Sequence, residues 1–299
     1  MRLVLTSDLH VDHHPEVISL VAERVRSLEP DVLVVAGDLS SSLDHLEQAL
    51  AGLRAAAPRA LFVPGNHDLW CLPDGPSSRE RYQTLLPARA RAAGFDALGR
   101  EAIEIGGLRF AGVTGWFDYT LRNQALDAQL PLDAYRRGAW GRLRWTDKVR
   151  IRWPDDAGAA LDDPAICDEQ LALLQAQLRD GAGAPTVVIT HHLPFAELVT
   201  SLQPTLACGQ GPRGELPWDF LNGFMGSARL GAAIRATPGV RMVLSGHTHF
   251  RKSVLLDGAD GPGTLRCEVS PLGYPREYRR AGLDLATRVR DRVSLVEVS

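Results

Sequence analysis

Five short clusters of polar residues carry side chains that could bind metal ions. Each cluster follows a run of apolar residues, and in chain order they are Asp8-Leu9-His10, Gly37-Asp38, Gly65-Asn66-His67-Asp68, His191-His192 and Gly246-His247-Thr248-His249. Carboxylate oxygen, amide oxygen and imidazole nitrogen together suit borderline divalent ions such as manganese, iron, zinc or cobalt. The clusters therefore indicate a hydrolytic site with two metal ions, in which Asp38 is the natural shared anionic ligand.

The apolar runs before these clusters are typical of buried strands, because they are rich in branched residues. The expected strands are Arg2–Leu5, Asp31–Val35, Ala60–Val63, Thr186–Ile189 and Val240–Leu244. In sheets whose strands alternate with helices, ligands gather beyond the carboxyl ends of the strands, where the loops converge. Clusters that are far apart in the sequence are therefore expected to meet at one opening.

Apolar residues at helical spacing predict the elements between these strands. The expected helices are Pro15–Glu29, Leu43–Ala57, Asp168–Arg179 and Ser227–Ala236. After the last cluster the apolar period changes to two, which predicts strands at Lys252–Leu256, Thr264–Val269 and Arg292–Val298. Antiparallel pairing of these three strands would give a second sheet packed on the first.

The order Asp-x-His, Gly-Asp, Gly-Asn-His-Asp, His, Gly-His-x-His resembles the calcineurin-like metallophosphoesterase superfamily, from Asp8 to His249. The resemblance implies an α/β fold, a four-layer α/β/β/α sandwich of two mixed β-sheets flanked by helices, as a single domain over residues 1–299. It also implies which residues bind metal. One ion would be held by Asp8, His10 and His249, the other by Asn66, His191 and His247, and Asp38 would bridge them.

In such a site a pair of ions lowers the pKa of a bound water and stabilises the attacking and leaving oxygens of an in-line displacement. A hydroxide bridging the metals, and not a side chain, would be the nucleophile. His67 lies next to a ligand and is not itself assigned to a metal, so it could protonate the leaving alkoxide or neutralise charge on the phosphoryl group. The resemblance implies the same role, which makes His67 and Asp38 the expected catalytic residues.

Two residues beside the ligands have alternative interpretations. Adjacent strand residues point to opposite faces, so only one of His191 and His192 easily reaches the metals. The family pattern favours His191 and leaves His192 as a supporting or structural residue. Asp68 could orient a ligand or cap a turn.

Residues 116–164 form an insertion without clear periodicity. Four of the six tryptophans lie there, Trp116, Trp140, Trp145 and Trp153, and seven basic residues fall between Arg136 and Arg152. Long irregular insertions on a rigid scaffold often bind ligands. We expect either a substrate cap, whose arginines pair with phosphate and whose rings stack on a planar group, or a flap whose tryptophans fill a small core.

If the insertion is a cap, the expected substrate contacts come from three parts of the chain. They are Asn66 and His67 beside the metals, Trp116, Arg136 and Arg137 of the insertion, and Asn222 of the loop-rich stretch Leu202–Gly226. That stretch could instead be a simple connection. Gly273-Tyr274-Pro275 could be a tight turn or a loop on the substrate side.

Composition and charge narrow the class of protein. The net charge of −3 over 299 residues and the pI near 6.3 argue against a protein that coats nucleic acid. The cysteines at positions 71, 167, 208 and 267 show neither zinc-motif spacing nor a disulfide pattern. No signal peptide and no apolar stretch near the ~20 residues of a membrane span is evident, so a cytoplasmic location is expected.

The sequence therefore predicts a metal-dependent phosphoester hydrolase with two divalent ions, for which manganese is the leading candidate and iron, zinc and cobalt are alternatives. A phosphodiesterase acting on a nucleotide-like or other small phosphodiester is the leading interpretation. A phosphomonoesterase is the alternative. A protein phosphatase is less favoured among phosphomonoesterases, because Gly37-Asp38 lacks the Val-Asp-Arg-Gly extension of those enzymes and Asp68 stands where they have Glu. A nuclease would bring further DNA-binding segments, and a noncatalytic scaffold would lack ligands. The physiological substrate and the oligomeric state stay open.

Overall fold

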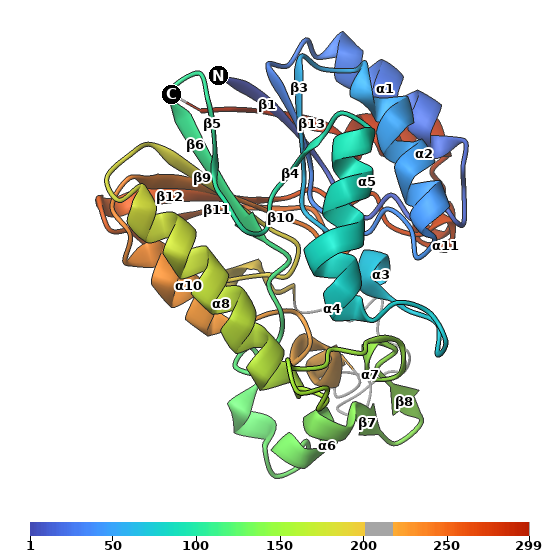
Figure 1. Ribbon diagram of the computed structural model, residues 1–299, viewed down its shortest axis with the longest axis vertical. Coiled ribbons are helices and arrows are strands. Elements are labelled where there is room, and N and C mark those ends of the chain that lie inside the picture. Colours follow the sequence, from blue (N-terminus) through green and yellow to red (C-terminus); the bar gives the residue numbers. More distant parts are fainter. Residues whose placement is uncertain (201–217, 299) are drawn as a thin grey trace.

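The computed structural model describes residues 1–200 and 218–298 of the chain. Two β-sheets pack face to face at its centre (Figure 1). The first sheet consists, in spatial order, of β13 (Ser294–Glu297), β1 (Arg2–Thr6), β2 (Val32–Val35), β3 (Arg59–Phe62) and β4 (Asp96–Ala97). The second consists of β11 (Lys252–Gly258), β12 (Gly261–Val269), β10 (Val240–Ser245), β9 (Thr186–Thr190), β6 (Leu108–Val113) and β5 (Ile103–Ile105). Each sheet mixes parallel and antiparallel pairs.

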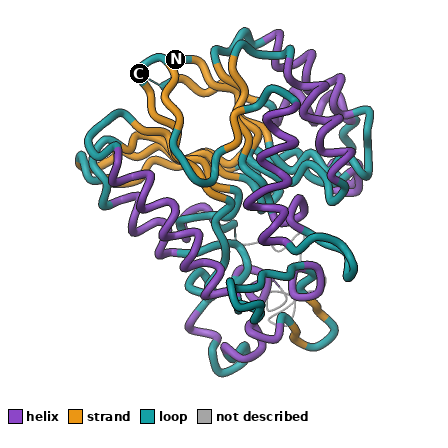
Figure 2. Tube along the Cα trace, in the orientation of Figure 1, coloured by secondary structure: helices purple, strands orange, loops and turns teal. Residues whose placement is uncertain are grey.

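Helices cover both outer faces of this pair of sheets (Figures 1 and 2). Beside the first sheet lie α1 (Val17–Ser27), α2 (Leu43–Arg54), α5 (Leu86–Ala92) and α12 (Leu285–Arg292). Beside the second sheet lie α8 (Asp163–Asp180) and α10 (Ala228–Arg235). The four-layer sandwich is thus confirmed, and so are the four expected helices. Helix α8 begins earlier than expected, because the Asp162 side chain accepts from the backbone N–H of Ala165 and Pro164 stands in the first turn.

Alternate strand residues build two separate apolar layers. Leu3 and Leu5 of β1 face the second sheet, where they pack with Ile189 of β9 and its neighbours. Val4 of β1 and Leu33 of β2 face the helices. Both faces of these strands are buried, which explains why the strands read as continuous apolar runs without alternation.

The last predicted strand belongs to a different sheet from the one expected. Strand β13 pairs antiparallel with β1 of the first sheet, where Arg2 lies opposite Glu297. Arg292, the expected first residue of this strand, instead ends α12. In addition, β12 runs parallel to β10, so only β11 and β12 form the expected antiparallel pair of the second sheet. A period of two predicts a strand, but it carries no information about the partner.

The insertion forms the lower end of the molecule in Figure 1. It contains α6 (Leu132–Arg137), the small pair β7 (Ala139–Trp140) and β8 (Leu143–Arg144), and α7 (Asp147–Arg150). Trp116 and Trp153 are buried in the same apolar cluster as the helix-facing strand residues, and Trp140 and Trp145 pack against it. The rings therefore do the packing that the flap interpretation expects.

Two other observations bear on expectations from composition. Cys71, Cys167 and Cys267 are buried free thiols, while position 208 lies outside the described residues. Among residues 1–200 and 218–298, no helix is long and apolar enough to cross a membrane.

Candidate metal centre

The seven predicted ligands come together beyond the carboxyl ends of strands from both sheets. Asp8 and His10 follow β1, Asp38 follows β2, Asn66 begins the short helix α3 (Asn66–Leu69) after β3, His191 follows β9, and His247 and His249 follow β10. Potential ligand atoms lie within 4.8 Å of one another in three groups: Asp8, His10 and His249; His10, Asp38 and His67; and Asp38, His191 and His247. His10 and Asp38 each belong to two of these groups, and of the two only Asp38 is shared with the group of His191 and His247.

The first group lies at the ends of β1 and β10. His249 Nε2 is 3.1 Å from His10 Nε2 and 3.3 Å from Asp8 Oδ1, while its Nδ1 lies 2.9 Å from Glu277 Oε1. Burial lowers the pKa of His249, but the carboxylates of Asp8 and Glu277 outweigh burial and raise that pKa to about 10. A proton on Nε2 suits this geometry without metal, and a cation at the same place would displace it. Glu277 then holds the ring as a second carboxylate partner.

The other predicted metal site combines the amide oxygen of Asn66 with the imidazoles of His191 and His247. His191 Nδ1 lies 2.8 Å from the carbonyl oxygen of Ala36, and His247 Nε2 lies 3.2 Å from that of Phe224. Because a carbonyl only accepts, these nitrogens carry the ring protons. The opposite nitrogens, His191 Nε2 and His247 Nδ1, lie 3.0 and 3.1 Å from Asn66 Oδ1. In the neutral rings, three acceptors therefore converge on one point, an arrangement that fits a bound cation.

A residue of the insertion holds the Asn66 amide in this orientation. Asn66 Nδ2 donates to both carboxylate oxygens of Asp147, at 3.0 and 3.2 Å. The indole N–H groups of Trp70 and Trp145 donate to the same carboxylate, at 2.6 and 2.9 Å. Burial raises the pKa of Asp147 to about 6, against the lowering effect of the hydrogen bonds from Asn66 and Trp70. An ionised carboxylate accepts only, so the amide N–H₂ turns toward it and Oδ1 turns toward the imidazoles.

The carboxylate of Asp38 lies between the two groups. Its Oδ1 is 3.4 Å from His191 Nε2, and its Oδ2 is 4.0 Å from His10 Nε2 and 3.9 Å from His67 Nε2. Burial raises the pKa of Asp38, but His191 and His67 outweigh burial and hold it well below the ordinary value. The same pairing, against the effect of burial, raises the pKa of His191 to about 9. An anion with one oxygen toward each group is what a shared ligand requires.

Asp68 ties two of the ligand loops together. Its carboxylate accepts from four backbone N–H groups, those of Asp38, Leu39, Ser40 and Gly65, at 2.8 to 2.9 Å. Burial and the nearby Asp38 raise the pKa of Asp68 to about 7, although these hydrogen bonds lower it. Asp68 therefore caps the turn that carries Asp38 and joins it to the loop of Asn66.

His192 belongs to none of the three ligand groups, as expected from its place beside His191. It is fully buried, and its ring packs 5.0 Å from that of Trp116 and 4.3 Å from that of His247. Neither of its ring nitrogens has a hydrogen-bond partner among the residues that the structure describes. His192 therefore supports the wall of the site through packing.

The backbone around the ligands is strained in a way that is uncommon elsewhere in the chain. Of seven non-glycine residues with positive φ in the described chain, five are predicted ligands: Asp8, His10, Asp38, His247 and His249. Such conformations cost of order 1–3 kcal/mol each and cluster at functional sites. Gly65 has a steric role, since an added Cβ would lie 2.2 Å from Asp38 Oδ1 and 2.7 Å from His191 Cε1. Only glycine lets these loops approach so closely.

His67, the expected general acid, stands at the edge of the ligand groups. Its ring stacks on Trp70 with centroids 3.7 Å apart, and its Nε2 lies 3.2 Å from the hydroxyl of Tyr274. Burial lowers the pKa of His67, against the raising effect of Asp38. Tyr274 also stacks on His10, with centroids 4.2 Å apart. The Gly273-Tyr274-Pro275 segment is thus part of the site.

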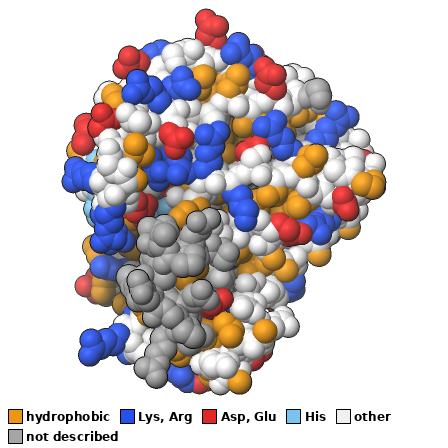
Figure 3. Space-filling model, turned by 180° about the vertical axis from the view of Figure 1, so that it is seen from behind, with side chains coloured by type: hydrophobic (Ala, Val, Ile, Leu, Met, Phe, Trp, Pro, Cys, Tyr) orange, Lys and Arg blue, Asp and Glu red, His pale blue; other side chains and the backbone are white. Residues whose placement is uncertain are grey.

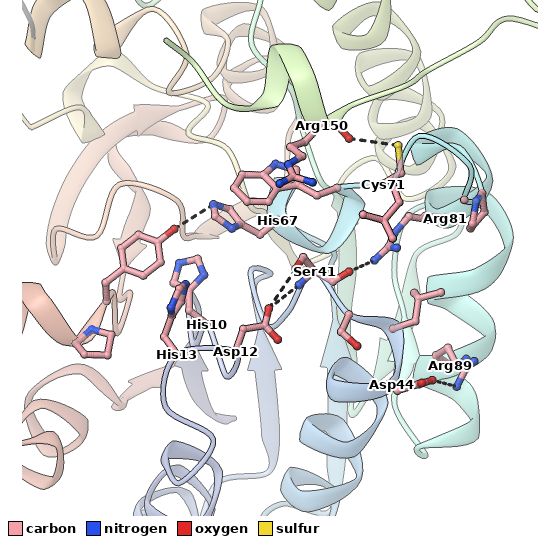
Figure 4. Close-up of a pocket in the computed structure, with 18 of the residues that line it drawn as sticks. His10, Asp12, His13, Ser41, Asp44, His67, Cys71, Arg81, Arg89 and Arg150 are labelled. Atoms are coloured by element: carbon pink, nitrogen blue, oxygen red, sulfur yellow. Dashed lines mark hydrogen bonds and ion pairs between the residues drawn. The ribbon is translucent and has the colours of Figure 1, made fainter. Parts of the chain in front are cut away.

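A cavity of about 1140 Å³ opens beside His67 (Figure 4). His10, His67 and Tyr274 form its end nearest the ligand groups. The rest of its wall comes from the turn after β1, the start of α2 and the loop before it, the segment after α3, the helical turn Arg81–Leu85, α5, α7 and α11 (Pro275–Arg280). In Figure 4 Arg150 lies on the same side of the cavity as His67, and Arg81 and Arg89 lie across from His10.

Five of the six expected substrate contacts do not line this cavity: Asn66, which lies among the ligand groups, and Trp116, Arg136, Arg137 and Asn222. Trp116 is 1% exposed, its indole N–H donates to Asp163, and its ring packs on Phe117, so it has no free face for a substrate. Arg136 and Arg137 are exposed on α6, where Arg137 pairs with Asp133. Most of the stretch Leu202–Gly226 lies outside the described residues.

Two residues that orient ligands were missed by the sequence analysis, Asp147 and Glu277. Asp147 is separated by 81 positions from Asn66, which it holds, and no spacing rule links them. Glu277 carried a weak local signal, because its carboxylate also accepts from the backbone N–H of Tyr274 at 3.1 Å, three residues earlier, at the start of α11. That pattern indicates a helix start and not a histidine partner.

The converging acceptor atoms lie where strands of both sheets end, an arrangement that could hold metal ions. A family model described as calcineurin-like phosphoesterase matches residues 1–251, and the chain belongs to this family. The family is described by phosphoester chemistry, and the His and Asp groups of this chain could hold metal ions.

Two curated relatives match parts of the chain. The [acyl-carrier-protein] phosphodiesterase PptH of Mycobacterium tuberculosis is 37% identical over 84 residues, which are 27% of this chain and 25% of PptH. An uncharacterized metallophosphoesterase of Helicobacter pylori is 25% identical over 134 residues, 42% of this chain and 33% of that protein. The chain thus matches only about a quarter to a third of these relatives' lengths.

Solved structures share the fold over nearly the whole chain. The crystal structure of phosphopantetheinyl hydrolase (PptH) from Mycobacterium tuberculosis superposes with a TM-score of 0.66 at 23% sequence identity. The superposition covers 95% of this chain and 93% of that one. The likeness shows a common architecture that extends beyond the matched sequence segment.

Proposed function

We propose that the protein is a phosphodiesterase that hydrolyses a small, nucleotide-like phosphodiester. The observation that carries this proposal is the position of His67, between the ligand groups on one side and the cavity of about 1140 Å³ on the other. A phosphomonoester has one organic substituent, whereas a diester needs room for two. The cavity gives the second substituent a place beside the proposed acid.

The roles of the chain's residues follow from their contacts. Two divalent ions, which we propose to be manganese, would be held by seven side chains: Asp8, His10, Asp38, Asn66, His191, His247 and His249. When bound, the ions would supply a nucleophile at neutral pH and offset charge on the reacting phosphate. His67 would give a proton to the leaving oxygen. Because burial lowers its pKa, the negative phosphate beside it would have to favour the protonated ring. Trp70 and Tyr274 fix the ring through stacking and the hydroxyl contact.

A second candidate substrate follows from the comparisons. The mycobacterial relative is named for action on an acyl carrier protein, and its solved structure is described as a phosphopantetheinyl hydrolase. The shared fold and the 37% identical segment support a phosphopantetheinyl diester as an alternative substrate for this chain. A cytoplasmic location is part of the same proposal.

The test is a reconstitution with matched substrates. Metal-free protein is loaded in parallel with manganese, iron, zinc, cobalt or magnesium and assayed on bis-p-nitrophenyl phosphate and p-nitrophenyl phosphate. We expect turnover of the diester to exceed that of the monoester, and Asp38→Asn to remove both. A clear preference for the monoester would refute the proposal and favour a phosphomonoesterase. Nucleotide diesters and a phosphopantetheinyl carrier protein, assayed next, separate the two candidate substrates.

A further inference from the structure

The cavity wall carries more positive charge than the protein as a whole. The chain has a formal net charge of −3, yet the described lining includes five arginines and only two acidic residues. The arginines are Arg81, Arg89, Arg150, Arg276 and Arg279, and the acids are Asp12 and Asp44. On the face shown in Figure 3, Lys and Arg side chains border the small pale-blue His surface at the left edge. Charge of one sign in a concave wall attracts ligands of the other sign.

Both acids of the wall already have partners. Asp12 accepts from the hydroxyl of Ser40 at 2.6 Å and from the backbone N–H of Ser41 at 3.0 Å, and it also contacts His45. Asp44 lies 3.3 Å from Arg89 Nη1. The two negative charges of the wall therefore interact with neighbouring groups of the protein.

Two of the five arginines are also engaged. Arg89 pairs with Glu47 and Asp44, and the Arg81 guanidinium is buried and donates to the carbonyl oxygens of Asp68 and Ser41. These two side chains hold loops and helices together.

The remaining three arginines have no acidic partner within the described parts of the chain. Arg150 lies at the end of α7, and Arg276 and Arg279 lie on α11, so they approach the cavity from two separate segments. The Arg276 guanidinium stacks over the Tyr274 ring at 5.0 Å, and Tyr274 contacts His67. Free guanidinium groups on two walls of one cavity suit a multiply charged oxyanion, because each group presents a fork of N–H donors.

We infer that this cavity is a subsite for a second phosphate group of the substrate, held by Arg150, Arg276 and Arg279. The inference rests on the proposed phosphodiesterase function and defines its substrate class as a diester with a further phosphate on one arm. A cavity of about 1140 Å³ has the size of a small-molecule site, slightly above the usual range of roughly 300–1,000 Å³. The second phosphate therefore belongs to a small molecule that enters the cavity and not to a protein surface.

The experiment measures binding, so that it does not depend on turnover. Manganese-loaded protein is titrated calorimetrically with thymidine 3′,5′-bisphosphate and with thymidine 5′-phosphate, which differ only in the second phosphate. We expect the bisphosphate to bind more tightly by roughly tenfold, the size expected when several exposed ion pairs act together. The preference should shrink between about 0.05 M and about 0.5 M salt because solvent-exposed charges are screened.

Matched variants separate this subsite from general surface charge. Arg150→Ser combined with Arg279→Ser should reduce the bisphosphate preference to about twofold or less. The control combines Arg142→Ser, between β7 and β8 of the insertion, with Arg280→Ser of α11. It removes the same charge at exposed positions that do not line the cavity. The control should retain the preference of the original chain.

Each result has a defined meaning. Equal binding of the two nucleotides by the original chain, or equal loss of preference in both double variants, would overturn the inference. Hydrolysis of bis-p-nitrophenyl phosphate by the same preparation reports on the proposed function. Failure there with a retained bisphosphate preference would reject the phosphodiesterase while leaving the phosphate subsite in place.

Discussion

Two regions of the chain meet at the metal centre and contribute to it differently. The loops after β1, β2, β3, β9 and β10 carry every side chain that is expected to face the ions. The insertion 116–164 carries none of these groups, yet its Asp147 fixes the amide of Asn66. The loops thus carry the atoms that would face the metals, while the insertion orients the side chain that carries one of those atoms.

The same difference appears in the packing of the two regions. The ligand loops are held by hydrogen bonds to their backbone, such as the four that the Asp68 carboxylate accepts from backbone N–H groups. The insertion is held by its rings, and one of them, Trp145, donates its indole N–H to Asp147, as does Trp70 from the segment after α3. Trp145 of the insertion therefore helps to position a carboxylate, while Trp116 and Trp153 pack in the apolar core.

The largest effect is expected from the residue that both ligand groups share. Asp38→Asn removes the anion between them, and we expect both metal ions to bind weakly and turnover to fall by more than the roughly 100- to 1000-fold loss of one transition-state hydrogen bond. Metal content after dialysis and kcat/KM on bis-p-nitrophenyl phosphate measure this. Full occupancy with full activity would show that the loops do not supply the bridge.

His67→Ala should be the next largest change. We expect both metals to stay bound and the rate to fall by about 10²–10⁴-fold for an alkyl ester, because the leaving alkoxide loses its proton donor. An activated aryl ester should be affected far less. If both esters slow equally, His67 acts through charge and not through proton transfer.

Sequence patterns could reveal the ligand loops because each ligand has a local signal, a polar side chain directly after a buried strand. They could not reveal Asp147 or Glu277, since each acts on a ligand brought near only by the fold. They also misplaced β13, because a strand of period two can join either sheet. The cavity wall could not be predicted from sequence patterns either, because several segments that are far apart in the chain form it.

Asp147→Asn tests the contribution of the insertion directly. The new amide presents one acceptor where the carboxylate presented two, and we expect the affinity of the Asn66 site for manganese to fall by about 10–100-fold, the usual cost of losing a partner of a ligand. Metal-buffered titration measures this affinity, and the thermal midpoint of the metal-free protein reports on structure alone. Asp133→Asn, an exposed change in the same insertion, is the control. Unchanged affinity would mean that the insertion only packs.

Glu277→Gln sharpens the comparison from the other side of the centre. Glu277 holds His249, so we expect a weaker effect, about tenfold, confined to the site of Asp8 and His249. Competition between manganese and a chelator resolves the binding of each ion. We expect this variant and Asp147→Asn to weaken two different metal-binding steps. A single common step would mean that the ions do not occupy separately supported positions.

The smallest effect is expected from the exposed arginines of the insertion. Arg136→Ser with Arg137→Ser removes two side chains on α6 that do not line the cavity, and surface changes of this kind usually alter stability by no more than about 0.5 kcal/mol. We therefore expect kcat/KM on bis-p-nitrophenyl phosphate within about twofold of the original chain. A large rise in KM would mean that α6 reaches the substrate during turnover, and the insertion would then both aim a ligand and close over the site. A small effect, set beside a large one in Asp147→Asn, would confine its role to the buried carboxylate.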